Sequence, residues 1–129
     1  MRVEHWDNAR RQGRTAAHNL VGRAETYDRV PYFYSDQFDL GLESIGLPGD
    51  GDELLVRHQD GGSHGGLVAV WLREGRVVAG MHANVWEAKK TIDRLVSAGG
   101  VIDRASFVDP TVPISALLPL EPTAGSGVR

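Results

Sequence analysis

A glycine-containing turn between two apolar runs is the feature that most constrains the fold of this chain. The runs are residues 67–72 and 77–83, and the turn is Arg-Glu-Gly-Arg at residues 73–76. Two apolar runs joined by a tight turn with glycine are typical of a β-hairpin. We therefore predict two antiparallel strands that lie side by side near the centre of a sheet.

Two further strands are predicted before this hairpin. Phe38, Leu40 and Leu42 alternate with polar or small residues, which is the pattern of a half-buried strand, so we expect Phe38 and Leu40 in the core. The aromatic residues 32–34 (Tyr-Phe-Tyr) come just before this strand, in a predicted loop that could present their rings to a ligand or a neighbouring domain. Residues 54–56 are apolar and predict a short second strand.

The N-terminal region predicts a helix over residues 6–21 that ends at Gly22. Its apolar face consists mostly of small residues, which bury little surface but allow another backbone to approach closely. Two arrangements are open: the helix lies across the sheet, or it needs a partner that this chain lacks. In the second case it should be frayed, swung away or paired with a second copy. The face consists of Trp6, Ala9, Gly13, Ala16, Ala17, Leu20 and Val21.

A second helix is predicted over residues 84–98, with Asn84 as its N-cap and Glu87 completing a capping-box-like pair. A short helix is expected over residues 114–118, and the tail 121–129 is expected to be disordered because it is rich in proline, glycine and serine. Together these elements predict an α+β fold. Its sheet should be mostly antiparallel with four to five strands, packed by the second helix and preceded by the first.

The composition narrows the classes of function. The chain of 129 residues is one domain by length and contains no cysteine, which excludes disulfides and thiol catalysis within it. The net charge of −3 argues against nucleic acid as the main partner. No apolar run approaches the roughly 20 residues that a bilayer requires, and the N-terminus has no apolar signal core, so we expect a cytoplasmic protein that does not enter a membrane.

Several residues could carry chemistry, but each also has a simpler interpretation. Asp36 and Asp39 could form an acid/base pair, although turn formation and solvation of a strand edge are the more common roles. The glycine-rich residues 60–66 run into a strand rather than a helix, which favours a mobile hairpin loop over a phosphate site. The histidines do not have the spacing of a metal site, and none is predicted. They are His5, His18, His58, His64 and His82.

Two motifs resemble a known family. Residues 3–9 read Val-Glu-His-Trp-Asp-Asn-Ala, and residues 32–37 read Tyr-Phe-Tyr-Ser-Asp-Gln. At this spacing the pair resembles the C-terminal part of FAD-dependent NAD(P)H:ferredoxin (rubredoxin) reductases, a family that includes relatives of apoptosis-inducing factor. The resemblance covers residues 3–100 or so. Tyr34 stands where the family commonly has tryptophan, which keeps an aromatic plane but shortens it.

This resemblance implies a division of the chain. Residues 1–24 would be the terminal helix of an otherwise missing FAD domain, residues 25–120 the reductase C-terminal α+β domain, and residues 121–129 a disordered tail. The chain contains no G-x-G-x-x-G motif, so we expect it to bind no cofactor alone. FAD and NAD(P)H are the cofactors of the parent family.

The resemblance also implies a set of site residues, in the context of a complete reductase. Trp6 would lie at the isoalloxazine ring of the flavin, near the N-terminus of the first helix. Glu4, His5 and Tyr34 would border the position where the nicotinamide stacks. The missing partner would also account for the small residues on the first helix.

Three hypotheses follow for the function. The first is a detached C-terminal domain of a ferredoxin reductase, inactive without its FAD and NAD domains or a split subunit. The second is a free-standing interaction module that docks a ferredoxin or rubredoxin, or forms a homodimer through its sheet. The third is a small independent enzyme that uses His82 or Asp36, which only the residue types support.

Overall fold

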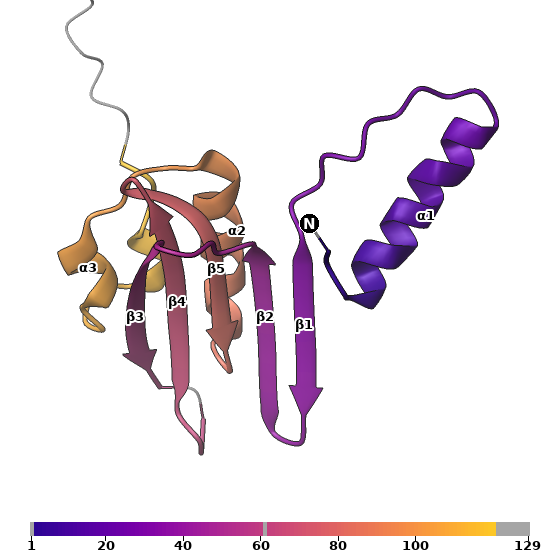
Figure 1. Cartoon of the computed structure of the whole chain (residues 1–129). Helices are drawn as coiled ribbons and strands as arrows, with labels where there is room; N and C mark the ends of the chain where they lie inside the picture. Colours follow the sequence, from indigo (N-terminus) through magenta and orange to yellow (C-terminus); the bar gives the residue numbers. More distant parts are fainter. Residues whose placement is uncertain (1, 61, 121–129) are drawn as a thin grey trace, which may run out of the picture.

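A computed structural model of the chain describes residues 2–60 and 62–120 and shows one antiparallel five-stranded sheet (Figure 1). The strand order is β1-β2-β5-β4-β3, and each neighbouring pair is antiparallel. The α+β prediction is therefore confirmed. The strands are β1 (Tyr32–Gln37), β2 (Leu40–Gly46), β3 (Glu53–Gln59), β4 (Gly66–Arg73) and β5 (Arg76–Ala83).

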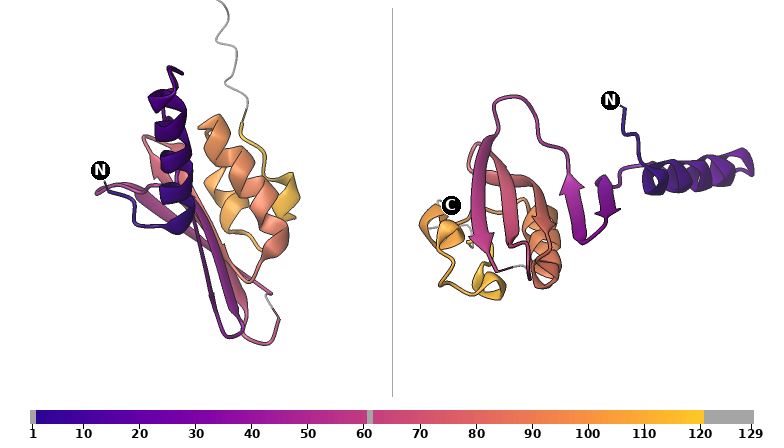
Figure 2. Two further views of the ribbon diagram at one scale, coloured as in Figure 1. Left: turned by 90° about the vertical axis from the view of Figure 1, so that its right-hand side faces the viewer. Right: turned by 90° about the horizontal axis from the view of Figure 1, so that it is seen from below.

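The helices take two different positions around this sheet. Figure 2 shows α2 and α3 on the same side of the sheet, where α2 packs against β5 and β2, and α3 packs against β3. In contrast, α1 projects from the edge strand β1, away from the rest of the molecule (Figures 1 and 2). The helices are α1 (Trp6–Leu20), α2 (Lys89–Ala98) and α3 (Arg104–Val108), with 3₁₀ turns η1 (Trp86–Ala88) and η2 (Ile114–Ala116).

The hairpin predicted from residues 67–83 is confirmed as β4 and β5. Its turn residues Glu74 and Gly75 have φ of 51° and 78°, the left-handed backbone that suits the right-handed twist of the two strands. Strand β5 is the central strand of the sheet. Its Gly80 lets α2 approach closely, because a Cβ there would lie 2.6 Å from Cγ2 of Ile92.

The core lies between this hairpin and the helices on its side. On α2, the side chains of Ile92, Leu95 and Val96 are buried and face this core. Burial of such side chains provides the main favourable free energy of folding, about 25 cal/mol per Å² of apolar surface. The buried side chains of this hydrophobic core are Val68, Val70, Leu72, Val77, Val85, Ala88, Ile92, Leu95, Val96, Ile102, Phe107, Ile114 and Leu117.

The prediction that Phe38 and Leu40 belong to the core is wrong. Phe38 and Asp39 form the two-residue turn between β1 and β2, where Phe38 has a φ of 58° and a fully exposed side chain. Leu40 begins β2 and is 46% exposed. The aromatic residues 32–34 lie in β1 rather than in the predicted loop, because this strand begins at Tyr32 and ends before the turn. The alternation from Phe38 to Leu42 runs through a turn, so its apolar positions do not share one face of one strand.

The predicted capping role of Asn84 is also wrong. Asn84 has a φ of 55°, and its Oδ1 accepts a hydrogen bond of 2.8 Å from the backbone N–H of Gly41. The side chain therefore connects the end of β5 to β2. The following residues form η1 first, and α2 begins at Lys89 without a side-chain cap.

A buried arginine fastens the C-terminal segment to the sheet. Arg57 on β3 is 1% exposed, and its guanidinium donates to the backbone carbonyls of Phe107, Pro110 and Val112. These bonds satisfy a charge that is costly to bury alone. Of the predicted helix over residues 114–118, only the η2 turn forms, while the tail 121–129 lies outside the described residues.

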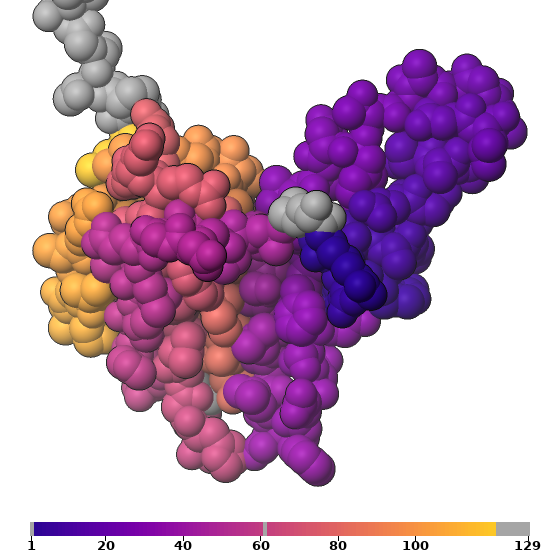
Figure 3. Space-filling model, viewed as in Figure 1, coloured from indigo at the N-terminus to yellow at the C-terminus, as the bar shows by residue number. Residues whose placement is uncertain are grey.

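The apolar face of α1 is exposed, and the arrangement in which this helix lies across the sheet is wrong. Trp6 is 64%, Leu20 88% and Val21 77% exposed, and the small residues between them are exposed as well. Figure 3 shows α1 and the segment that follows it as a lobe that stands off the body. The expectation of a helix swung away from the sheet is confirmed.

Candidate functional site

Two of the predicted site residues meet where α1 begins. The ring of His5 lies 4.9 Å from that of Phe33 and 5.0 Å from that of Tyr34, centroid to centroid. The His5 ring also lies between two backbone N–H groups, with Nδ1 3.3 Å from the nitrogen of Asp7 and Nε2 3.4 Å from that of Tyr34. A neutral imidazole accepts at only one nitrogen, so it bonds one of these groups at a time. His5 thus joins the N-terminus of α1 to β1. We call the three rings of His5, Phe33 and Tyr34 the aromatic junction.

The other two predicted residues lie beside this junction and point into solvent. Trp6 is largely exposed, and the guanidinium carbon of Arg10 lies 5.0 Å from the centroid of its ring. Glu4 pairs with Arg2 at 2.5 Å, and both side chains are exposed. Among the described residues, neither Glu4 nor Trp6 forms a hydrogen bond or ring contact with Tyr34. The structure therefore brings His5 and Tyr34 together, and the ring of Tyr34 remains partly exposed.

The first turn of α1 carries a buried carboxylate. Asp7 is 7% exposed and accepts from Arg11 Nε at 2.7 Å and from Arg10 Nη2 at 3.4 Å. Burial raises the pKa of Asp7, but the hydrogen bonds from Arg11 and Arg10 outweigh this effect and leave the pKa lowered. The carboxylate also lies at the positive end of the helix dipole. These interactions stabilise the start of α1 next to the aromatic junction.

A polar cluster behind the junction was not predicted. Glu43 on β2 and His82 on β5 face each other, with Oε2 and Nε2 3.5 Å apart. Tyr32 donates to the other oxygen of Glu43 at 2.8 Å, and the pKa of Tyr32 is raised mainly by burial and further by this hydrogen bond. Lys89 Nζ lies 3.7 Å from Glu43 and 5.2 Å from the Tyr32 ring centroid. Finding this cluster from sequence requires the register between β2 and β5.

The remaining candidates are dispersed. Asp39 lies in the turn after β1 and pairs with His64 of the loop between β3 and β4, while Asp36 lies within β1. Within residues 2–60 and 62–120, no three His, Asp or Glu residues are grouped so that they could hold a metal ion. In the same part of the chain, every helix is too short or too polar to cross a bilayer.

A comparison with models of protein families shows which family the chain belongs to. A model described as "Reductase C-terminal" matches residues 32–118. The chain belongs to this family. The match contains all five strands and both helices that pack on the sheet, and it begins at Tyr32, immediately beside the aromatic junction.

Similar proteins include two curated reductases. The ferredoxin–NAD(+) reductase component of an anthranilate 1,2-dioxygenase system from Burkholderia cepacia is 34% identical over 119 residues, or 92% of this chain. The ferredoxin reductase subunit of a 5,5′-dehydrodivanillate O-demethylase from a Sphingobium species is 36% identical over 117 residues, or 91% of this chain. The chain spans 29% and 28% of the lengths of these relatives.

A solved structure agrees with the same assignment. The reductase in a covalent putidaredoxin reductase–putidaredoxin complex superposes with a TM-score of 0.66 at 27% identity, over 89% of this chain and 27% of that one. An alignment over 89% of the chain is longer than residues 32–129, so it includes at least part of the segment that precedes β1.

The described residues offer exposed aromatic surface but do not contain the parts of a whole FAD site. The half-exposed rings of Phe33 and Tyr34 and the exposed ring of Trp6 offer flat surfaces for an aromatic ligand. A strand–glycine loop–helix unit, which would hold the pyrophosphate, is absent from residues 2–60 and 62–120. In a complete reductase, the groups around His5 could contact the flavin ring while other domains hold the rest of the cofactor.

Proposed function

We propose that this chain acts as the C-terminal part of an FAD-dependent NAD(P)H:ferredoxin reductase. In this proposal residues 1–24 complete an FAD domain, and residues 25–120 form the C-terminal α+β domain. The FAD and NAD domains belong to another part of the same polypeptide or to a partner subunit. The observation that carries the proposal is the exposed aromatic junction at the N-terminus of α1, next to an exposed face of small residues.

The exposed face of α1 supports the need for another domain. Around Gly13, no atom outside the local helix backbone lies within 4 Å of the position that a Cβ would take. A helix of 15 residues with few tertiary contacts is marginal in water, because most helical stability in proteins comes from packing. Docking of this face against an FAD domain would supply the missing contacts.

The junction residues have distinct roles in this proposal. His5 is a positioning residue, because its ring packs against Phe33 and Tyr34 and holds them at the start of α1. Tyr34 and Trp6 contact the cofactor rings and exclude water from them, while Glu4 borders the nicotinamide position. Bound FAD would supply the capacity to accept a hydride and release single electrons, which this chain lacks.

The proposed electron acceptor is a ferredoxin or rubredoxin. The relatives named above are ferredoxin reductases, and one solved relative is linked to putidaredoxin. The alternative of a free-standing module that docks a ferredoxin predicts binding by the chain alone. Amide shifts in the 129-residue chain on titration with a ferredoxin would favour that module, and their absence would favour the need for the other domains.

A chimera tests the proposed function. The matching C-terminal part of the Burkholderia cepacia reductase is replaced by this chain, and flavin content and NADH-dependent ferredoxin reduction are measured. We expect stoichiometric flavin and turnover. Tyr34→Ala should lower turnover about tenfold, equivalent to about 1.4 kcal/mol, with the flavin retained.

The matched control is Phe38→Ala, which removes a fully exposed aromatic side chain from the far end of the same hairpin. This variant should leave turnover unchanged. A soluble chimera without flavin would contradict the proposal for α1, and equal effects of the two substitutions would contradict the role of Tyr34.

A further inference from the structure

The segment after α1 folds back along the helix and is fastened to it at two places. At the C-terminal end of the helix, Asn19 exchanges two hydrogen bonds with the backbone of Glu25, of 2.8 and 3.0 Å. Near the N-terminal end, the hydroxyl of Tyr27 donates to Asn8 Oδ1 at 2.9 Å. We call residues 22–31 the return segment. Its two attachments hold it next to α1 without filling the space between them.

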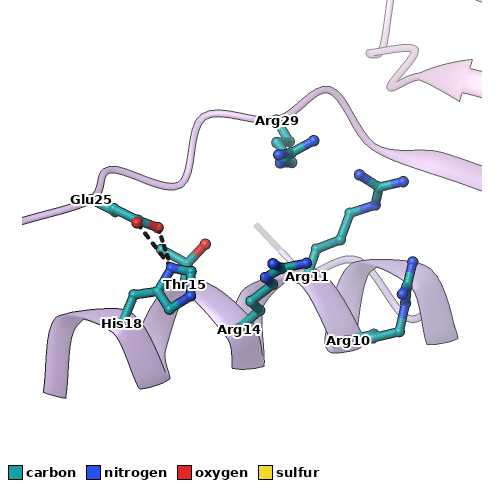
Figure 4. A pocket seen from close by; sticks show the side chains of 7 residues that line it. All are labelled: Arg10, Arg11, Arg14, Thr15, His18, Glu25 and Arg29. Carbon is teal, nitrogen blue, oxygen red and sulfur yellow. Dashed lines mark hydrogen bonds and ion pairs between the residues drawn. The ribbon is translucent and has the colours of Figure 1, made fainter. Parts of the chain in front are cut away.

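That space is a hollow of about 430 Å³ lined almost entirely by charged and polar side chains. Arg11, Arg14, Thr15 and His18 line it from α1, and Arg29 enters from the return segment. Figure 4 shows Arg29 pointing toward the helix and Arg11 pointing toward the return segment. The volume lies in the range of small-ligand sites, but the described lining consists of arginine, threonine, histidine and glutamate side chains, which suit a charged ligand better than an apolar one.

The negative groups near the hollow are already engaged. Glu25 bonds His18 Nδ1 at 2.9 Å, and this hydrogen bond is the main reason why the pKa of Glu25 is lowered. Asp7 is paired with Arg11. The side chains of Arg14 and Arg29 make no hydrogen bond or ion pair within the described residues. The guanidinium groups of Arg14 and Arg29 therefore face the same hollow from opposite walls without an ion pair, and the one carboxylate in the described lining, that of Glu25, is bonded to His18 and interacts with Arg14 only at longer range.

We propose that the hollow between α1 and the return segment binds a small phosphorylated anion of the pyrophosphate class. Arg14 and Arg29 would contact it from the two walls, with Arg11 and the hydroxyl of Thr15 as further donors. Guanidinium groups match phosphate oxygens with paired N–H donors, and a multivalent anion can engage both walls at once. Such a ligand would replace repulsion between the arginines by attraction.

This site is separate from the surface used in the proposed function. Positions 11, 14, 15 and 18 recur at helical spacing on one face of α1, while Ala9, Gly13 and Ala16 lie on the opposite face. A domain docked on the small-residue face would leave the arginine face accessible. The two proposals therefore succeed or fail independently.

Calorimetric titration of the full chain with inorganic pyrophosphate at low ionic strength tests the site. We expect saturable 1:1 binding that weakens with added salt. Arg14→Gln and Arg29→Gln should each weaken binding at least about tenfold, because each removes a charge-assisted contact. Amide chemical shifts of Thr15 and His18 should change in the same titration. Citrate, which carries carboxylates instead of phosphates, should bind about tenfold more weakly.

Arg94→Gln on the exposed side of α2 is the control and should bind like the wild type. Thr15→Asp adds a carboxylate to the hollow without removing an arginine and should abolish binding. Circular dichroism establishes that each variant retains its helices. The proposal is overturned if pyrophosphate does not saturate, if Arg94→Gln weakens binding as much as Arg14→Gln, or if citrate binds as tightly.

Discussion

His82 is a buried titratable group at the centre of the sheet. It is 1% exposed, and neither ring nitrogen makes a hydrogen bond within the described residues. The groups that face it are Glu43 on β2, Glu87 on η1 and Lys89 on α2. Burial lowers the pKa of His82, and the nearby Glu43 carboxylate offsets this only in part. The structure therefore contains a neutral imidazole that becomes costly when protonated.

We predict that acidification destabilises the chain through His82. Because its pKa is lower in the folded than in the unfolded state, the unfolded state binds more protons below pH 6.5, the ordinary value for histidine. Stability should be highest above this pH and fall as the pH drops from 6.5 toward the folded-state pKa. Urea unfolding at pH 7.5 and pH 5.5 measures the change.

His82→Gln should reduce this pH dependence, whatever its effect on stability at pH 7.5. His58→Gln is the matched control, since His58 is exposed on the edge strand β3. An unchanged difference between the two pH values in His82→Gln would contradict the prediction.

The two-residue turns between β1 and β2 and between β4 and β5 show what single residues reveal before a structure is known. Gly75 marks its turn because glycine adopts positive φ without strain, and the hairpin around it was predicted with its correct pairing. Phe38 adopts positive φ as well, but no local signal distinguishes it from a strand residue. Its apolar side chain therefore led to a core assignment that the turn geometry contradicts.

At the scale of elements, the packing of α2 on β5 depends on the missing side chain of Gly80. A Cβ there would meet Cγ2 of Ile92 at 2.6 Å, closer than carbon atoms approach in folded proteins. The element and its buried face were predictable from helical spacing. The start of α2 was not, because Asn84 bonds the neighbouring strand instead of capping the helix.

We predict opposite effects for two Gly→Ala substitutions. Gly80→Ala should destabilise the chain by about 1–3 kcal/mol, because α2 must move away from the sheet. Gly13→Ala in α1 meets no atom within 4 Å and should stabilise that helix by about 1 kcal/mol through its higher helix propensity. Urea unfolding measures the first effect and the helical circular dichroism signal on heating measures the second. A stabilised Gly80→Ala variant would show that α2 is not held at this distance.

At the scale of the whole molecule, α1 should be less protected than the sheet. Its outward face is exposed, whereas β4 and β5 are central strands with buried side chains on both. Hydrogen exchange followed by mass spectrometry should show faster exchange in residues 6–20 than in residues 66–83. Sedimentation velocity on the same sample reveals whether a second copy covers the helix. Slower exchange in α1 than in β4 in a monomer would contradict the prediction.

The candidate site was predictable only in part at this scale. The motifs placed His5, Trp6 and Tyr34 in one region, and the structure brings the rings of His5 and Tyr34 to 5.0 Å. The arginine hollow could not be predicted, because Arg29 approaches α1 only through the folded-back return segment. The contact depends on the two attachments of that segment, which join residues 6 and 19 positions apart in the sequence.

These attachments also make α1 and the return segment into a single arm. The arm is connected to the sheet where residue 31 enters β1 and where His5 packs against Phe33 and Tyr34. A rotation of the arm about this pivot would carry His5 across the ring of Tyr34. Binding of any molecule that shifts α1 would therefore also affect the first strand of the sheet, which lies some distance from the binding site.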